Sequence, residues 1–356
     1  MRPYGAPQLD VPVLLNVNEN PYPPSSAVVK DIAASVTEAA AGLNRYPDRE
    51  FLELRQALAA YLTVESGVAG LEAAGIWAAN GSNEVMLHLL QAFGGPGRTL
   101  LSFAPTYSMY PEYARDTATR WVAGGRREDF TLDPAVVREE IRANRPAVIV
   151  LASPNNPTGT ALPLADVAMV LDAARGAGPD GADAVVVIDE AYSEFRRDGT
   201  PSALTLLAQH PHLAVTRTMS KAFALAGARL GYLAAVPALV DVLRVVRLPY
   251  HLSAVTQAVA LAALRHAGSL LAQVARLRDE RDATVSWLRE RGLRVADSDA
   301  NFALFGVFDD ADALWQGLLD RGVLIRASGP AGWLRVSIGT PEEMAAFRAA
   351  LGEVLG

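Results

Sequence analysis

The chain has 356 residues, of which 51% are hydrophobic and 20% charged, a composition typical of a globular protein. Its formal net charge of −7 argues against a nucleic-acid-binding protein, and the absence of cysteine excludes disulfides and thiolate metal sites. No apolar run approaches the roughly 20 residues that span a bilayer, and residues 1–5 lack the apolar core of a signal peptide, so we expect a cytoplasmic protein.

Three parts are expected in chain order, because single hydrophobic cores stop growing at roughly 250–300 residues. Residues 1–25 are rich in proline and asparagine without a regular period, and residues 27–41 have helical apolar spacing. We therefore predict an amino-terminal arm and helix over 1–40, a large domain over 41–248 and a small carboxy-terminal domain over 249–356.

Short apolar runs alternate with helical patterns in the second part, and each run ends in polar or turn residues. Such runs are typical of buried parallel strands, which predicts an α/β fold with a mostly parallel central sheet flanked by helices. Ligands bind beyond the carboxyl ends of such strands, so the polar segments should converge on one crevice. The runs are residues 76–79, 99–103, 147–151, 184–188 and 213–216.

The pattern changes after residue 249. Two long helical stretches extend to about residue 291, and short strands follow at 302–305, 323–326 and 333–338 with helices between and after them. This alternation predicts a smaller α/β domain. The five histidines are not spaced as metal ligands, so no metal site is expected.

Lys221 is the first candidate for chemistry. The 32 basic residues include only two lysines, Lys30 and Lys221, and Lys221 follows a predicted buried strand. A primary amine condenses with an aldehyde, whereas arginine forms no Schiff base. The context favours a catalytic lysine, although a solvated lysine is the alternative.

Asp189 ends a run of five apolar residues. A buried carboxylate needs a cationic partner, and the protonated ring nitrogen of pyridoxal 5′-phosphate (PLP) would be one. A strand-end helix cap or a structural salt bridge is the alternative.

Two further segments and an aromatic residue give weaker signals. Residues 80–83 form a turn that opens a helix, where backbone amides can bind phosphate. Residues 153–159 are a cluster of turn residues, and Tyr107 could either stack on a planar ring or pack as an ordinary aromatic.

Together these segments resemble the fold-type I PLP-dependent aminotransferases of class II, through Asn156 before Pro-Thr-Gly, Asp189 with Tyr192, Ser220-Lys221 and Arg229. The resemblance implies that Lys221 binds PLP as a Schiff base and acts as the catalytic base. It also implies that Asp189 pairs with the ring nitrogen of PLP and that Tyr107 covers the face of that ring. Asn156 and Tyr192 would bind the ring oxygen. The phosphate would be held by Ser82, Asn83, Ser220 and Arg229, with Gly81 allowing the close turn.

The segments 15–22, 44–48, 298–302 and 333–340 are similar to those of histidinol-phosphate aminotransferases. In that family the residue matching Tyr46 reaches the cofactor phosphate of the neighbouring subunit, which implies a homodimer. The positions that bind substrate match Asn20, Tyr22, Arg326 and Arg335. Without the resemblance, the two arginines would be interpreted as edge-strand surface charge.

The resemblance implies transamination of L-histidinol phosphate with 2-oxoglutarate, giving imidazole acetol phosphate and L-glutamate in histidine biosynthesis. Three alternatives stay open at this point. They are an aromatic amino-acid aminotransferase, a PLP-dependent decarboxylase of the phosphothreonine type, and a PLP-sensing regulator. The regulator would need a nucleic-acid-binding domain, for which this sequence has neither length nor a basic segment.

Overall fold

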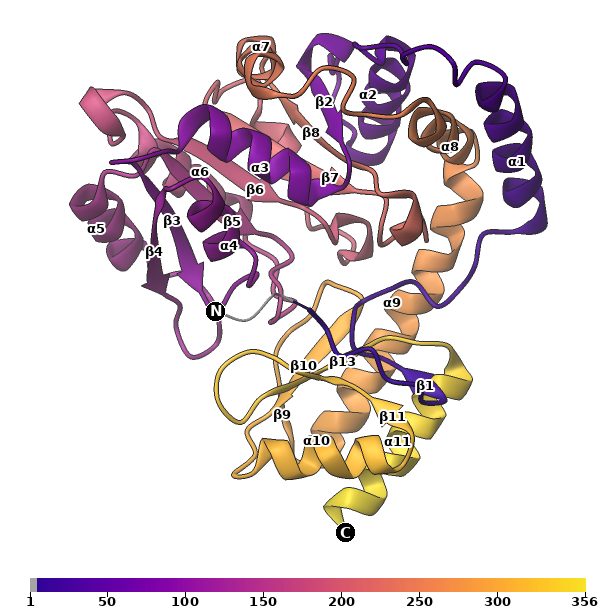
Figure 1. The fold of residues 1–356 in the computed structure, drawn as a ribbon. Coiled ribbons are helices and arrows are strands. Elements are labelled where there is room, and N and C mark those ends of the chain that lie inside the picture. The colour runs from indigo at the N-terminus through magenta and orange to yellow at the C-terminus, as the bar shows by residue number, and fades with distance from the viewer. Residues whose placement is uncertain (1–4) are drawn as a thin grey trace.

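A seven-stranded sheet forms the centre of the larger part of the molecule in the computed structural model, which describes residues 5–356 (Figure 1). Residues 1–4 of the predicted arm lie outside the described residues. Only β8 runs antiparallel to its neighbours, so the predicted mostly parallel sheet is confirmed. The strands, in spatial order, are β2 (Ile76–Ala79), β8 (Gly231–Ala235), β7 (Leu213–Thr218), β6 (Val185–Asp189), β5 (Val148–Ala152), β3 (Thr99–Ala104) and β4 (Arg120–Gly125).

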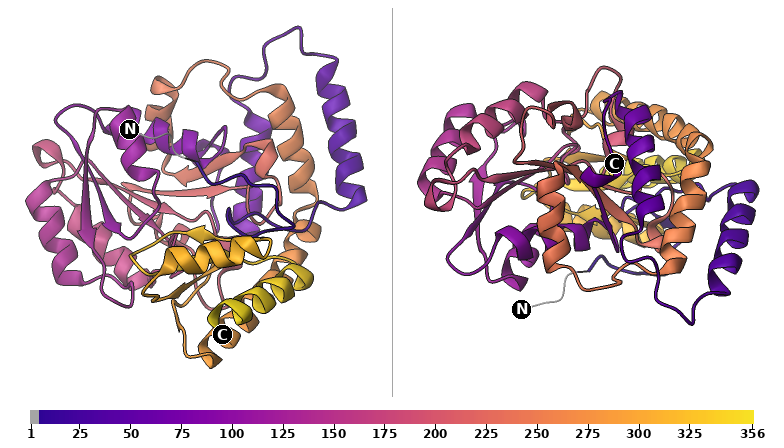
Figure 2. Two further views of the ribbon diagram at one scale, coloured as in Figure 1. Left: turned by 60° about the horizontal axis from the view of Figure 1, so that its bottom comes forward. Right: turned by 90° about the horizontal axis from the view of Figure 1, so that it is seen from above.

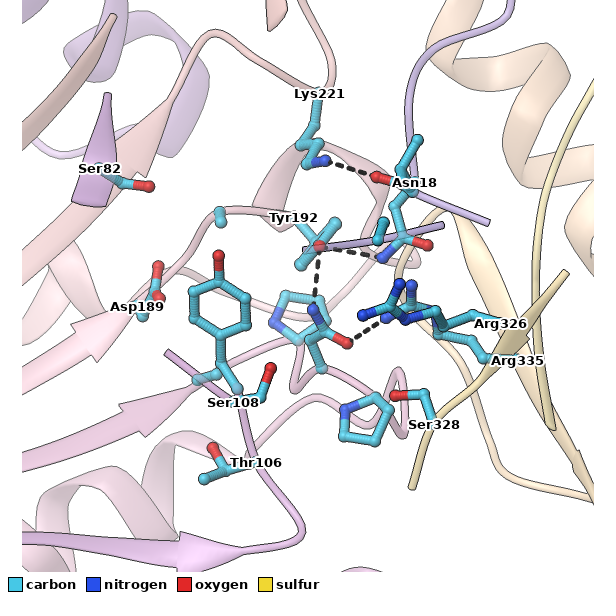
Figure 3. Close-up of a pocket in the computed structure, with 18 of the residues that line it drawn as sticks. Asn18, Ser82, Thr106, Ser108, Asp189, Tyr192, Lys221, Arg326, Ser328 and Arg335 are labelled. Atoms are coloured by element: carbon cyan, nitrogen blue, oxygen red, sulfur yellow. Dashed lines mark hydrogen bonds between the residues drawn. The ribbon is translucent and has the colours of Figure 1, made fainter. Parts of the chain in front are cut away.

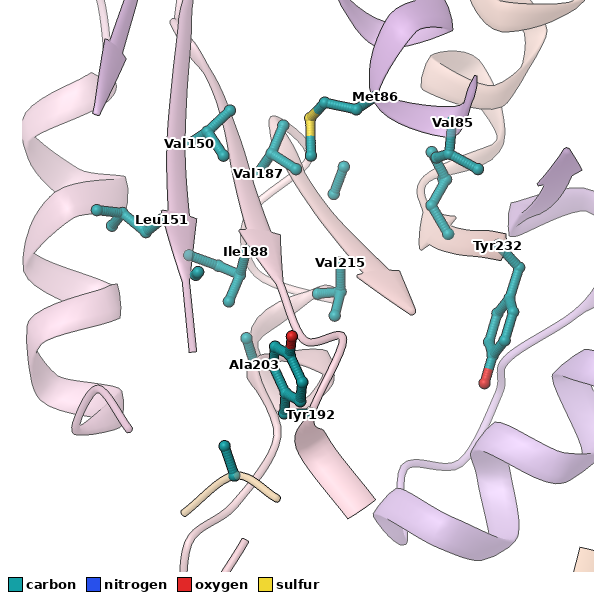
Figure 4. Packing of buried hydrophobic residues seen from close by; sticks show 14 of the residues in the cluster. Val85, Met86, Val150, Leu151, Val187, Ile188, Tyr192, Ala203, Val215 and Tyr232 are labelled. Carbon is teal, nitrogen blue, oxygen red and sulfur yellow. The ribbon is translucent and has the colours of Figure 1, made fainter. Parts of the chain in front are cut away.

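Helices flank this sheet and bury its central strands. Every residue of β5, β6 and β7 is buried, which explains why these strands are continuous apolar runs rather than alternating ones. Figure 4 shows Leu151, Ile188 and Val215, which occupy neighbouring positions in register on the three strands. The flanking helices are α2 (Leu52–Ser66), α3 (Ser82–Phe93), α4 (Tyr110–Asp116), α5 (Pro134–Asn144), α6 (Leu164–Ala174) and α7 (Pro237–Val246).

A long helix, α9 (Ala267–Glu290), leads from the large sheet to a smaller four-stranded antiparallel sheet (Figures 1 and 2). This arrangement confirms a smaller carboxy-terminal α/β region. Its strands, in spatial order, are β12 (Arg326–Ala327), β13 (Leu334–Ser337), β10 (Phe302–Gly306) and β9 (Arg294–Val295), and its helices are α10 (Ala311–Asp320) and α11 (Pro341–Leu355).

The amino-terminal segment joins the two regions. Strand β1 (Val13–Leu14) pairs in parallel with β11 (Val323–Leu324) of the small region, and α1 (Ser26–Ala40) packs against α8 (Ala254–Arg265). The predicted helix over 27–41 is therefore confirmed as α1, and the predicted strand over 323–326 is divided between β11 and β12. The division at residues 40 and 248 stays a prediction, since α8 packs against α1 and α2.

Five short 3₁₀ turns complete the chain, at Ala73–Gly75, Pro179–Gly181, Ser193–Phe195, Ala203–Leu206 and Ala226–Ala228. Within residues 5–356, no single helix is long and apolar enough to cross a membrane. Helices α8 and α9 pass that test only as a pair, and their axes bend by 72° at the break between them.

A buried ion cluster is centred on Arg217 of β7 and holds this strand in place. The guanidinium of Arg217, which is 1% exposed, lies 2.7 Å from Glu190 Oε2 and 3.0 Å from Glu65 Oε2. Its Nη1 lies 3.3 Å from Glu194 Oε1, and burial raises the pKa of Glu194. Because β7 leads directly to Lys221, this cluster fixes the strand that delivers the lysine.

Candidate active site

A cavity of about 860 Å³ lies at the carboxyl ends of the central strands, between the large sheet and the small region. Its position confirms that the polar segments following β3, β5, β6 and β7 converge on one crevice. Eleven of the predicted site residues line it, namely Ser82, Asn83, Tyr107, Asn156, Asp189, Tyr192, Ser220, Lys221, Arg229, Arg326 and Arg335.

Four predicted site residues do not line this cavity. Gly81 lies immediately before α3, behind Ser82. Asn20 Oδ1 accepts a hydrogen bond from the backbone of Tyr22 at 3.0 Å, and Asn20 Nδ2 donates to Ala222 O at 3.4 Å, so both residues fasten the arm beside the lysine loop. Tyr46 is 80% exposed and stacks on Tyr250 with ring centroids 4.4 Å apart.

Lys221 projects from the loop after β7 into the cavity (Figure 3). Its Nζ donates a hydrogen bond to Val17 O at 3.1 Å. Burial lowers its pKa from 10.5 to about 8; Arg335 and Arg229 also lower the pKa, and Glu19 opposes them. The amine is therefore partly neutral near pH 8, which a nucleophile or a proton carrier requires.

Asp189 is the last residue of β6 and its carboxylate is buried at the cavity wall. Burial raises its pKa, whereas hydrogen bonds donated by the hydroxyls of Tyr110 (3.0 Å) and Thr216 (3.1 Å) lower it. A cation in the cavity would hold this carboxylate ionised.

An anion cradle lies where α3 begins beside Arg229. Gly81 has φ 87°, and a Cβ added to it would meet Arg229 Nη2 at 2.5 Å, so only glycine lets the two segments approach this closely. Arg229 Nη1 lies 3.4 Å from Ser220 Oγ. Backbone N–H groups at the helix start, hydroxyls and a guanidinium together suit a phosphate.

Four polar side chains form a network along one wall of the cavity (Figure 3). Tyr192 OH accepts hydrogen bonds from Asn18 Nδ2 at 3.1 Å and from Asn156 Nδ2 at 3.4 Å. Asn156 Oδ1 accepts from Arg335 Nη1 at 2.6 Å, and Arg335 Nη2 donates to Asn16 O at 3.0 Å. The network joins both sheets and the amino-terminal segment.

Arg326 and Arg335 lie opposite each other on neighbouring antiparallel strands, β12 and β13. Arg335 is 6% exposed, so the interpretation of this residue as surface charge is wrong. Arg326 Nη2 donates to Gly5 O at 3.3 Å, and its Nη1 is buried with no hydrogen-bond partner among residues 5–356. Both side chains face the cavity, where they can bind an anion.

The sequence interpretation missed four contributors to this site, Val17, Asn18, Tyr110 and Thr216. Asn18 lies in the asparagine-rich arm, and Tyr110 follows Tyr107 by three residues at the start of α4. These positions were visible, but no local pattern indicates that the chain brings them to Tyr192 and Asp189.

The sequence is similar to those of known aminotransferases over nearly its whole length. The model of aminotransferase class I and II matches residues 11–351. Histidinol-phosphate aminotransferase 3 of Burkholderia lata is 61% identical over 99% of this chain and 93% of its own. The histidinol-phosphate aminotransferase of Thermobifida fusca is 61% identical over 98% of this chain and 92% of its own.

Solved structures agree. Histidinol-phosphate aminotransferase from Sinorhizobium meliloti in complex with pyridoxal-5′-phosphate is 25% identical, with a TM-score of 0.82 over 97% of this chain and 91% of that one. Thermus thermophilus aspartate aminotransferase with maleate is 25% identical, with a TM-score of 0.80 over 96% of this chain and 90% of that one. The chain therefore belongs to the class I and II aminotransferase family and, within it, to the histidinol-phosphate aminotransferases.

Proposed function

We propose that the protein transfers the amino group of L-histidinol phosphate to 2-oxoglutarate, forming imidazole acetol phosphate and L-glutamate in histidine biosynthesis. One observation carries this proposal. A single cavity combines a buried amine, a buried carboxylate, an anion cradle and two arginines. Relatives 61% identical over nearly the whole chain have that activity in their names.

The residues present fit PLP. Lys221 would bind its aldehyde, the carboxylate of Asp189 its ring nitrogen, and Tyr107 its ring face. Asn156 and Tyr192 would contact the ring oxygen. The cradle would hold the phosphate through Ser82, Asn83, Ser220 and Arg229, because Gly81 lacks the Cβ that would collide with the guanidinium. When bound, PLP supplies a ring that accepts the electron pair left at the substrate α-carbon.

Lys221 and Asp189 would divide the proton transfers. Asp189 would keep a proton on the ring nitrogen, since a buried carboxylate needs a positive charge beside it. Lys221, whose pKa burial lowers to about 8, would take the proton from the substrate α-carbon and would return it at the C4′ carbon. The contact with Val17 O keeps its amine beside the arm that closes this side of the cavity.

Arg335 and Arg326 would bind the anionic tails of both substrates. Histidinol phosphate carries a phosphate and glutamate carries carboxylates, so one site must accept two anions in turn. Planar guanidinium groups bind both in a forked manner. Arg326 Nη1, buried and without a hydrogen-bond partner among residues 5–356, is available for this role.

The test compares initial rates of 2-oxoglutarate-dependent transamination with histidinol phosphate, phenylalanine and phosphothreonine. We expect kcat/KM for histidinol phosphate to exceed that for phenylalanine by at least about tenfold, because two guanidinium groups match a doubly charged phosphate better than a carboxylate. A higher value for phenylalanine, or CO2 release from phosphothreonine without a keto acid, would overturn the assignment.

We further propose a homodimer that acts in the cytoplasm. Val245, Leu248 and Tyr46 are 83%, 75% and 80% exposed, and Tyr46 stacks on the partly exposed Tyr250. Large apolar side chains gathered on a surface favour an interface with a second copy. Tyr46 would then reach the cofactor phosphate of the partner subunit. Small-molecule substrates and the lack of cysteine support the cytoplasm.

A further inference from the structure

The hydroxyl of Tyr192 accepts from two amides whose orientations are set by their other contacts. Arginine only donates, so Asn156 must turn Oδ1 to Arg335 and Nδ2 to Tyr192. Asn18 N donates to Ser337 Oγ at 2.8 Å, and the Ser337 hydroxyl donates to Asn18 Oδ1 at 2.9 Å. Asn18 therefore also turns Nδ2 to Tyr192.

The donors that orient these amides share one strand of the small region. Arg335 and Ser337 are two residues apart on β13, so their side chains leave the same face of the strand. One holds the oxygen of Asn156 and the other holds the oxygen of Asn18. β13 thus directs two N–H donors at a single phenol oxygen in the large region.

Asn18 is itself held tightly. It is 2% exposed, and Asn301 Nδ2 donates to its backbone oxygen at 3.1 Å. Its φ of 56° lies in the left-handed region, which asparagine adopts more readily than most residues. Its neighbour Val17 accepts the hydrogen bond from Lys221. The amide is therefore fixed between the small region, the lysine and Tyr192.

A phenol oxygen that accepts from two amides directs its single hydrogen away from both of them. The same two contacts withdraw electron density from the phenol and make its O–H a stronger donor. We propose that Asn18 is a positioning residue, whose amide keeps the Tyr192 hydroxyl donating to the ring oxygen of bound PLP. This inference rests on the cofactor assignment made above and not on the identity of the substrate.

The consequence is measurable without turnover. A ring oxygen that receives a strong hydrogen bond releases less electron density to the nitrogen contributed by Lys221, which then holds its proton less tightly. The absorbance of the Lys221–cofactor chromophore reports that proton. The charged groups near it, Arg335, Arg229, Glu19 and Asp189, are the same in every variant below.

The experiment is a pH titration of the absorbance of the purified holoenzyme with no amino donor present. Asn18→Gly removes the amide and keeps the left-handed backbone unstrained. We expect its titration midpoint to rise by about half a pH unit or more, the size of one hydrogen bond to a titrating group. Ser337→Ala, which frees the Asn18 amide to turn, should shift it in the same direction by less.

Two controls distinguish the effect of losing the Asn18 side-chain amide from the effect of loosening the amino-terminal segment. In a double-mutant cycle, Asn18→Gly should have no effect on the midpoint when Tyr192→Phe is already present. Asn301→Ala loosens the same segment without touching Tyr192, and should leave the midpoint unchanged. An unshifted midpoint in Asn18→Gly, an equal shift on the Tyr192→Phe background, or an equal shift in Asn301→Ala would overturn the proposal.

These outcomes are distinct from those of the substrate test. If the midpoints shift as expected but the enzyme does not use histidinol phosphate, only the proposed substrate is wrong. If the enzyme uses histidinol phosphate but the Asn18→Gly variant has the midpoint of the parent, only the proposed role of Asn18 is wrong.

Discussion

Lys221 is costly to bury as a cation, because a charged amine loses its hydration in the cavity wall. Burial lowers its pKa from 10.5 to about 8. Between these two values the unfolded chain binds more protons than the folded one, so the free energy of unfolding rises with pH. Below pH 8 the folded protein keeps the full cost of the charge, which is about 3 kcal/mol for a shift of this size.

Cofactor-free Lys221→Met should therefore be more stable than the cofactor-free parent at pH 7, by about 3 kcal/mol. The difference should shrink as the pH rises from about 8 to 10.5. Urea unfolding of both proteins at several pH values measures it. A stability difference that stays constant over this range, or a variant less stable than the parent at pH 7, would contradict the lowered pKa of Lys221.

Among single residues, the sequence predicted Lys221 and Asp189 from their positions at the ends of apolar strands. It did not predict the residues that hydrogen-bond to them. Asp189 could be recognised because a carboxylate ending five apolar residues must be buried. Its donors Tyr110 and Thr216 come from α4 and β7, and the sequence does not show which distant side chains meet there. Arg335 was ambiguous for the same reason, since burial of a short strand depends on tertiary packing.

Element α3 contributes its first turn to the anion cradle, and the close approach of Arg229 explains the glycine before it. Gly81→Ala should raise the dissociation constant for PLP at least about tenfold, because the added Cβ would meet the guanidinium. Gly70→Ala is the matched control. Its φ of 80° imposes the same backbone strain, while its Cβ would meet nothing within 4 Å.

Equilibrium binding of PLP to the cofactor-free variants measures this effect, with the midpoint of thermal unfolding as a measure of strain alone. The two variants should lose similar stability and differ in cofactor affinity. Equal affinities would show that the cradle does not hold the phosphate.

Strand β7 depends on the buried cluster around Arg217. Arg217→Met should destabilise the cofactor-free protein by about 3–5 kcal/mol, since it leaves the buried Glu194 without its cation and leaves Glu190 and Glu65 with Arg196 alone. Arg142→Met is the contrasting variant, because its ion pair with Glu139 is fully exposed and screened by water, so its loss should change the free energy of unfolding little. Urea denaturation of both variants tests this, and a loss below about 1 kcal/mol for Arg217→Met would refute it.

The elements themselves were largely visible in the sequence. Buried parallel strands appear as apolar runs, and α1 and the long helices follow helical spacing. The exceptions include β4 and β8, which the apolar runs did not predict, and the segment 323–326, where one expected strand is divided between two sheets. Pairing with β1, which is distant in sequence, causes this division and leaves no local signal.

The whole molecule is expected to work as a dimer, with Tyr46 of each subunit completing the site of the other. Co-expression of Tyr46→Ala and Lys221→Ala subunits should then restore activity that neither variant has alone. A hybrid dimer contains one intact site, so random pairing gives about a quarter of the parent activity per subunit. Activity no greater than that of the separately purified variants would exclude a shared site.

The fold class follows from the sequence because α/β alternation is a property of the entire chain. How the arm, the small region and the sheet enclose one cavity does not follow, since Asn18, Arg335 and Tyr192 meet only through long-range packing. The resemblance to known aminotransferases supplied the roles of residues that local patterns left open.

The most direct test of the account uses the fact that the chain contains only two lysines. Holoenzyme is reduced with borohydride to fix the cofactor on its lysine, digested, and analysed by mass spectrometry. We expect the pyridoxyl phosphate group on the peptide that contains Lys221 and none on the peptide that contains the exposed Lys30. A label on Lys30, or an unlabelled Lys221 in enzyme that transaminates, would contradict the assignment of the active site.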